Sequence, residues 1–149
     1  MSSEAGGPYV QMAAICERVL QEKDGVLSIV RVVDRFTITV SGPTPPEEMP
    51  PGTISLTMVI MLKSGFIRAR HNLRIVPTTP SGQNLPELSA GVLLEGEDRG
   101  VNVFFNIQMP VREEGLYWFD VLLENQLLTR IPLRLLYQRV SQGPLFEKP

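Results

Sequence analysis

The chain has 149 residues, 43% of them hydrophobic and 20% charged, and its 14 Lys and Arg against 16 Asp and Glu give a net charge of −2 at pH 7. This length fits one domain, and this composition excludes a chain that is disordered throughout. The balanced charge argues against nucleic acid or an anionic membrane as a partner. A single cysteine, Cys16, excludes an internal disulfide and a zinc site built from cysteines.

Residues 1–8 contain neither the basic start nor the apolar stretch of a signal peptide. No apolar run approaches the roughly 18 to 20 residues that a membrane span requires. We therefore expect a cytoplasmic protein without membrane association. Residues 1–8 are expected to form an N-terminal tail, residues 9–140 one domain, and residues 141–149 a C-terminal tail.

The first predicted element, Tyr9–Leu20, allows two interpretations. Its apolar residues fit a helical stripe, in which Met12, Ile15 and Val19 share one face. A strand that enters a Lys23-Asp24-Gly25 turn and pairs with the following segment fits equally well. We favour the strand because its natural partner, Val26–Val40, comes directly after the turn.

The segment Cys16-Glu-Arg-Val-Leu-Gln-Glu-Lys-Asp-Gly-Val-Leu-Ser-Ile-Val-Arg31, with a proline-rich loop after it, resembles the opening of an uncharacterised family of small bacterial proteins. The resemblance implies a bacterial origin. It brings no assigned chemistry with it.

Short apolar segments at hairpin spacing fill the rest of the chain, separated by turn residues and by two long loops, Ser41–Gly52 and Pro77–Pro86. Apolar and polar residues alternate within them, as half-buried strands require. Eight segments of strand length predict a sandwich or barrel and argue against a βαβ fold.

The only histidine, His71, belongs to a segment in which Ile67, Ala69, Leu73 and Ile75 share its parity. A histidine on an apolar face is usually a core residue, so we predict a buried ring that stays mostly neutral at pH 7 and performs no chemistry. Arg68, Arg70 and Arg74 project from the opposite face of the same segment. They are candidate contacts for phosphates or carboxylates, although cross-strand acids would turn them into an ordinary solvated face.

No cofactor or metal site is predicted. The acidic loop around Glu95, Glu97 and Asp98 is reminiscent of calcium-binding loops in sandwich domains, but it offers too few oxygen ligands and is interpreted as a solvated hairpin tip. The sequence contains no phosphate-binding loop, nucleophile elbow or HExxH motif. We therefore expect a protein that is not an enzyme.

The most specific local pattern is Glu113-Glu-Gly115-Leu-Tyr117-Trp-Phe119-Asp-Val121. It resembles the tyrosine corner of immunoglobulin-like and fibronectin-type sandwiches, in which a buried tyrosine hydroxyl bonds to a backbone group upstream. The resemblance implies that Tyr117 is the corner tyrosine and that Phe119 replaces the cysteine of antibody domains. The expected fold is therefore an all-β, immunoglobulin-like antiparallel sandwich of about seven to nine strands.

Alternation in the last two segments places a second apolar set on the face opposite Tyr117. A strand cannot turn both sets inward, so this face is expected to be covered by a second copy of the chain, a protein partner or one of the tails. The predicted interface residues are Leu116, Trp118, Leu122, Leu128 and Leu136.

Two functions of different classes follow from these features. The favoured one is a non-enzymatic module for protein interaction or assembly, with a protein partner or a homo-oligomer. The alternative is a ligand-binding or enzymatic β domain with a loop-built site near His71. A hollow that contains His71 with a carboxylate in reach would favour the alternative.

Overall fold

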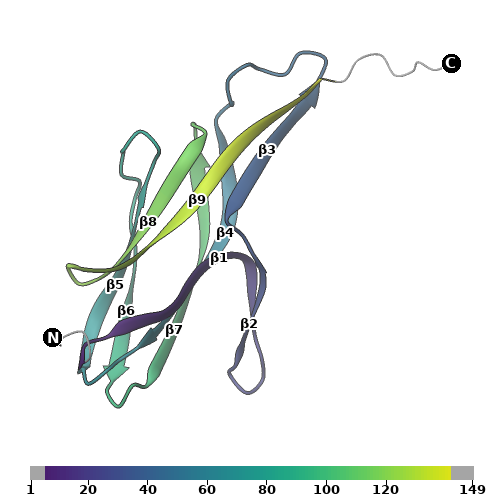
Figure 1. The fold of residues 1–149 in the computed structure, drawn as a ribbon. Coiled ribbons are helices and arrows are strands. Elements are labelled where there is room, and N and C mark those ends of the chain that lie inside the picture. The colour runs from purple at the N-terminus through teal and green to yellow at the C-terminus, as the bar shows by residue number, and fades with distance from the viewer. Residues whose placement is uncertain (1–5, 142–149) are drawn as a thin grey trace.

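A computed structural model describes residues 6–141, which form nine β-strands in two facing sheets (Figure 1). The four-stranded sheet has the order β2-β1-β4-β7, and the five-stranded sheet has the order β3-β9-β8-β5-β6. The predicted all-β sandwich is therefore confirmed. The strands are β1 (Tyr9–Gln21), β2 (Leu27–Val32), β3 (Arg35–Gly42), β4 (Gly52–Lys63), β5 (Arg68–Thr78), β6 (Leu88–Glu95), β7 (Gly100–Val111), β8 (Gly115–Leu123) and β9 (Gln126–Ser141).

The first segment is a strand, as favoured from the sequence. β1 pairs with β2 on one side and with β4 on the other, and Ile15 lies opposite Met58. A register shift between Val10 and Met12 lets apolar residues face inward although their spacing is not strictly two. Ile15 and Cys16 are adjacent and both buried, so apolar residues occupy both faces of this strand, which is why they also fitted a helical stripe.

The prediction of Val26–Val40 as a single segment is wrong in one respect. These residues form two strands, which belong to different sheets. β2 pairs with β1, and Arg31 near its end has a φ of 58°. The chain then crosses at Val33 and Asp34 to the other sheet. There β3 pairs in parallel with β9, and Phe36 lies opposite Leu135. Among the described strands this is the one parallel pair, so the sandwich is not antiparallel throughout.

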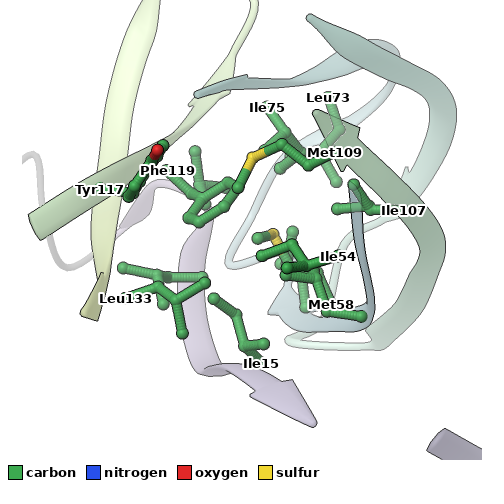
Figure 2. Close-up of a cluster of buried hydrophobic side chains, with 14 of the residues drawn as sticks. Ile15, Ile54, Met58, Leu73, Ile75, Ile107, Met109, Tyr117, Phe119 and Leu133 are labelled. Carbon is green, nitrogen blue, oxygen red and sulfur yellow. The ribbon is translucent and has the colours of Figure 1, made fainter. Parts of the chain in front are cut away.

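The core lies between the two sheets and is built from the inward-facing residues that alternation identified. Met58, Leu73 and Phe119 are fully enclosed there (Figure 2). Burial of such side chains is the main stabilising contribution in a fold of this kind, at about 1.5–3 kcal/mol for each large one.

The predicted tyrosine corner is present at the start of β8. Tyr117 is 1% exposed, and its hydroxyl donates a hydrogen bond of 2.7 Å to the carbonyl oxygen of Glu113. Burial raises the pKa of this phenol above its ordinary value. Gly115 has a φ of 128°, and a Cβ at that position would lie 2.9 Å from the side chain of Pro80, so the turn requires glycine.

β4 is buried on both of its faces. Val59 is 0% exposed and Thr57 is 5% exposed, although both have the parity opposite to the core residues Met58 and Ile60. Their neighbour across the strand pair is β1, where Cys16 lies opposite Thr57 and is 1% exposed. Burial raises the pKa of the Cys16 thiol. The outer face of the four-stranded sheet thus also contains buried residues.

Part of each predicted tail lies outside the described residues, namely residues 1–5 and 142–149. Gly6 is described, and its carbonyl oxygen accepts a hydrogen bond of 2.8 Å from the backbone N–H of Phe66. Within residues 6–141 there is no helix with the length and apolarity that a membrane crossing needs.

Candidate interaction surface

The outer face of the five-stranded sheet combines apolar side chains with arginines, and we call it the arginine-lined face. Its β8 residues are the ones that alternate with the buried Tyr117, Phe119 and Val121. Its other residues lie opposite these or opposite one another across the strand pairs, or share the parity of such a residue on the same strand. The arginine-lined face comprises Leu116, Trp118, Asp120 and Leu122 on β8, Leu127, Arg130, Pro132, Arg134 and Leu136 on β9, Arg68, Arg70 and Arg74 on β5, and Arg35 on β3.

Four of the five predicted interface residues lie on this face. Leu116, Trp118, Leu122 and Leu136 are half-buried and alternate with core residues. The placement of Leu128 is a correction, because Leu128 packs against the core. A register shift after Val121 places Leu127 opposite Leu122, and Leu127 is 50% exposed. A one-residue shift exchanges the two faces of a strand, which explains why parity alone pointed to the wrong leucine.

Trp118 forms the centre of a small polar and aromatic cluster. The guanidinium carbon of Arg130 lies 4.5 Å from the centroid of the indole ring, within the range of a cation–π interaction. The Arg130 Nε in turn donates a hydrogen bond of 2.8 Å to Asp120 Oδ1. Asp120 is directly opposite Arg130 in the β8–β9 pair. Within residues 6–141, the guanidinium group of Arg130 lies over Trp118. The predicted cover by the C-terminal tail, residues 141–149, falls outside the described residues from residue 142 onward.

The arginine stripe on β5 divides into two parts. Arg74 is engaged by the protein itself, because its Nε and Nη2 donate two hydrogen bonds of 3.1 Å to the Glu87 carboxylate. This pairing raises the pKa of Arg74 and lowers the pKa of Glu87. Arg68 and Arg70 are exposed, and neither forms an ion pair with any carboxylate of residues 6–141.

Sequence reasoning missed the arginines that β9 and β3 add to this face. Arg134 is exposed between the buried Leu133 and Leu135, so strict alternation along β9 is a signal that would have found it. Arg35 lies directly opposite Arg134 in the parallel β3–β9 pair. No local sequence pattern predicts that β3 and β9 pair, because the two strands are about one hundred positions apart in the chain.

The prediction of a core histidine is wrong. The side chain of His71 is 29% exposed, and its Nδ1 lies 3.5 Å from Glu124 Oε2. It borders an open hollow of about 310 Å³ lined also by Pro8, Ile67 and Leu123. Residues of this parity are buried only from Leu73 onward, as Leu73 and Ile75 show, whereas Ala69 is exposed near the beginning of β5.

The Glu124 carboxylate beside His71 has a structural partner of its own. Its Oε2 accepts a hydrogen bond of 2.7 Å from the backbone N–H of Asn72. The backbone N–H of Glu124 donates to the carbonyl oxygen of Asn72 at 2.8 Å, and the Glu124 carbonyl oxygen accepts from Arg74 Nη1 at 3.1 Å. Glu124 therefore holds the β8–β9 turn against β5.

The acidic loop between β6 and β7 is balanced by a neighbouring cation. Arg99 Nη2 lies 3.5 Å from Glu97 Oε1, and Arg99 Nη1 lies 3.9 Å from Glu95 Oε1. Glu97 and Asp98 both have positive φ, which defines a tight turn. Across residues 6–141 no group of three or more metal-ligating side chains is gathered.

Residues 11–136 match the model of a family of unknown function, DUF6941. The match spans most of the domain, and the chain belongs to this family. The expected resemblance to an uncharacterised family of small proteins is confirmed to that extent. No curated protein matches the chain.

Proposed function

We propose that this domain is a non-enzymatic interaction module whose arginine-lined face binds an acidic segment of a partner protein. The observation that carries the proposal is the position of Trp118. It lies half-buried under Arg130 on the same sheet face as the exposed arginines Arg70, Arg134 and Arg35. None of these last three forms an ion pair within residues 6–141.

The chemistry of this face is that of protein interfaces. Tryptophan and arginine are the residue types that contribute most to binding energy at interfaces, and leucine side chains around them exclude water. Guanidinium groups bind carboxylates through two parallel hydrogen bonds, as Arg74 already does with Glu87. A partner segment that carries Asp or Glu beside an apolar side chain complements both properties.

We also propose that the sandwich is a variant of the immunoglobulin-like fold. In that fold one sheet contains strands G, F and C, extended by C′ in variable-type domains, and the other contains A, B and E. The orders β9-β8-β5-β6 and β1-β4-β7 agree with these two series, and the Tyr117 corner then falls on strand F. The chain departs from the constant-type pattern by going from β6 directly to β7, without a strand D.

A cytoplasmic location is part of the proposal, supported by the single buried cysteine and by the absence of disulfides among the described residues.

The second candidate function is small-molecule binding in the hollow beside His71. The observation in its favour is the carboxylate of Glu124 at 3.5 Å from the imidazole. Against it, that carboxylate is already bonded to the Asn72 backbone, and the hollow is lined mainly by Pro8, Ile67 and Leu123 with Asn125 and Gln126. The arginine-lined face therefore remains the better-supported site.

A photoreactive phenylalanine analogue at Leu136 tests the proposal in cells that make the protein. The matched control carries the analogue at Ser55, an exposed position on the outer side of β4. We expect the Leu136 protein to form a covalent adduct whose partner peptide, identified by mass spectrometry, is rich in Asp and Glu. Adducts of equal yield from both positions, or partner peptides without acidic residues, would contradict the proposal.

Binding of that partner peptide, made synthetically, then separates charge from packing. Arg134→Glu and Trp118→Ala are each expected to weaken binding about 30-fold, since residues at the centre of an interface often contribute about 2 kcal/mol. Arg18→Glu is the matched control, because it is an equal charge reversal on β1 of the other sheet. Equal losses for Arg18→Glu and Arg134→Glu would show a non-specific charge effect instead of a defined site.

A further inference from the structure

The outer edge of β7 is a long strand edge without a neighbour among residues 6–141. β7 pairs with β4 over its whole length, from Gly52 opposite Val111 to Lys63 opposite Gly100, without a register shift. On its other side the sheet order places no strand. Backbone N–H and C=O groups on that side point outward at alternate residues, which makes the edge a template for another strand.

The other three edge strands carry features that oppose pairing. β2 has only 6 residues, and Arg31 within it has a φ of 58°. β3 begins at the exposed Arg35, and β6 contains Gly91 and ends at Glu95. Short length, charge and backbone irregularity are the devices that protect sheet edges. β7 has 12 residues, Gly-Val-Asn-Val-Phe-Phe-Asn-Ile-Gln-Met-Pro-Val, with no charged side chain and its only proline near the C-terminal end.

The side chains of β7 leave apolar surface exposed on both faces of the sheet. Phe104 points to the outer face and is 40% exposed. Val103 and Phe105 pack against the core, yet both remain half-buried. A strand added at this edge would cover all three.

We propose that β7 pairs antiparallel with β7 of a second copy of this chain, about a two-fold axis at Phe104, to form one continuous eight-stranded sheet. In this register Phe104 faces its own copy, Asn102 faces Asn106, Val103 faces Phe105, and Val101 faces Ile107. Each pair joins side chains of the same character on the same face of the sheet. Pro110, which cannot donate a ladder hydrogen bond, falls outside the paired region.

The self-complementary pattern is what selects a second copy as the occupant. A two-fold interface brings each residue type opposite a fixed partner on an identical strand, and here no pair meets a like charge. An uncharged strand offers no electrostatic preference for a different, charged partner. The proposed interface lies on the four-stranded sheet, so it leaves the arginine-lined face of each copy free and is independent of the function proposed above.

Charged substitutions at Asn102 and Asn106 test both the pairing of the β7 edge with a second copy and the register of that pairing. Both side chains are exposed, and they are four residues apart on the same strand. The double variant Asn102→Lys, Asn106→Lys places two lysines opposite each other twice per dimer, and we expect a dissociation constant at least tenfold higher than that of the natural sequence. The variant Asn102→Lys, Asn106→Glu places each lysine opposite a glutamate of the other copy. It is expected to dimerise at least as tightly as the natural sequence.

Sedimentation velocity over a concentration series, on the full chain, provides the measurement. Thermal unfolding of each variant shows whether it folds, which matters because Thr57 Oγ1 donates a hydrogen bond of 3.0 Å to Asn106 Oδ1. The variants Ser89→Lys and Ser89→Glu, on the β6 edge, are the matched control. They should leave the dissociation constant of the dimer unchanged.

Amide hydrogen exchange distinguishes the other possible occupants. A monomer at all concentrations with rapidly exchanging β7 amides would overturn the proposal, since the edge would be open. A monomer with protected β7 amides would overturn it as well, because the chain itself would then cover the edge. A dimer that responds equally to both double variants would place the contact elsewhere.

Discussion

On the outer face of the four-stranded sheet Val59 and Cys16 are enclosed, at 0% and 1% exposure, whereas on the outer face of the five-stranded sheet Trp118 remains half-buried beneath a single arginine. The first two residues lie on β4 and β1, where β4 is the middle strand with β1 paired on one side and β7 on the other. The second face carries long charged side chains, which cover apolar neighbours but leave their own charges in water. Two sheets with the same alternation thus differ in how far their outer faces are buried, and the arginine-lined face is the one on which we propose binding.

The largest expected effect comes from placing a carboxylate on each of these two faces. Val59→Asp should lower the free energy of unfolding by about 3 kcal/mol or more, because the new charge has no partner at a fully enclosed position. Leu122→Asp should cost less than about 1 kcal/mol, as surface substitutions do, and its carboxylate would lie opposite Arg74. Urea unfolding of both variants measures the difference. Equal costs would mean that the two outer faces are packed alike.

Removing the hydroxyl group from either of two tyrosines is expected to lower the free energy of unfolding by a smaller amount. The hydroxyls of Tyr117 and Tyr137 each donate a hydrogen bond of 2.7 Å to a backbone carbonyl, of Glu113 and of Pro46 respectively, but only Tyr117 is buried. Tyr117→Phe should cost about 1 kcal/mol or more, since the Glu113 carbonyl loses its partner. Tyr137→Phe should cost less because water can replace the lost donor near the surface. Thermal and urea unfolding compare the two, and an unchanged stability of Tyr117→Phe would show that the corner hydrogen bond is not needed.

The raised pKa of Tyr117 predicts that the free energy of unfolding declines at high pH. Burial raises the pKa of Tyr117 in the folded protein, so its contribution is fully present below the ordinary tyrosine pKa of about 10. That contribution is lost as the pH rises from there through the folded pKa. The Tyr117→Phe variant should lack this component of the decline, and urea unfolding at a series of pH values up to the alkaline limit measures it.

The smallest effect distinguishes the engaged arginine of β5 from a free one. Because Arg74 lowers the pKa of Glu87, the ion pair adds stability above the ordinary glutamate pKa of about 4.3. That stability is lost as the pH falls through the lower folded pKa. Arg74→Gln should return the Glu87 pKa toward its ordinary value, whereas Arg70→Gln should leave it unchanged. NMR titration of the side-chain carboxyls gives both values, and a shift in the Arg70→Gln protein would show that the two arginines act together.

Local patterns in the sequence by themselves determined much of this protein. Alternation along β4, β7 and β8 identified strands and their inward residues, because a strand that is half-buried must alternate. The resemblance of the residues around Tyr117 to a tyrosine corner predicted its hydrogen bond, which is local because donor and acceptor are four residues apart. Trp118 and three of the four leucines predicted beside it lie on the face that parity assigned to them.

Only the tertiary structure decided which strands are neighbours and how each irregularity is resolved. The parallel pairing of β3 with β9 brings Arg35 to Arg134 across nearly the whole chain, and nothing local specifies it. The register shift after Val121 turned Leu128 inward, and the position of His71 near the beginning of β5 left its ring partly exposed. Parity establishes that a strand has two faces, but burial depends on what lies against each face, and that is a property of contacts distant in sequence.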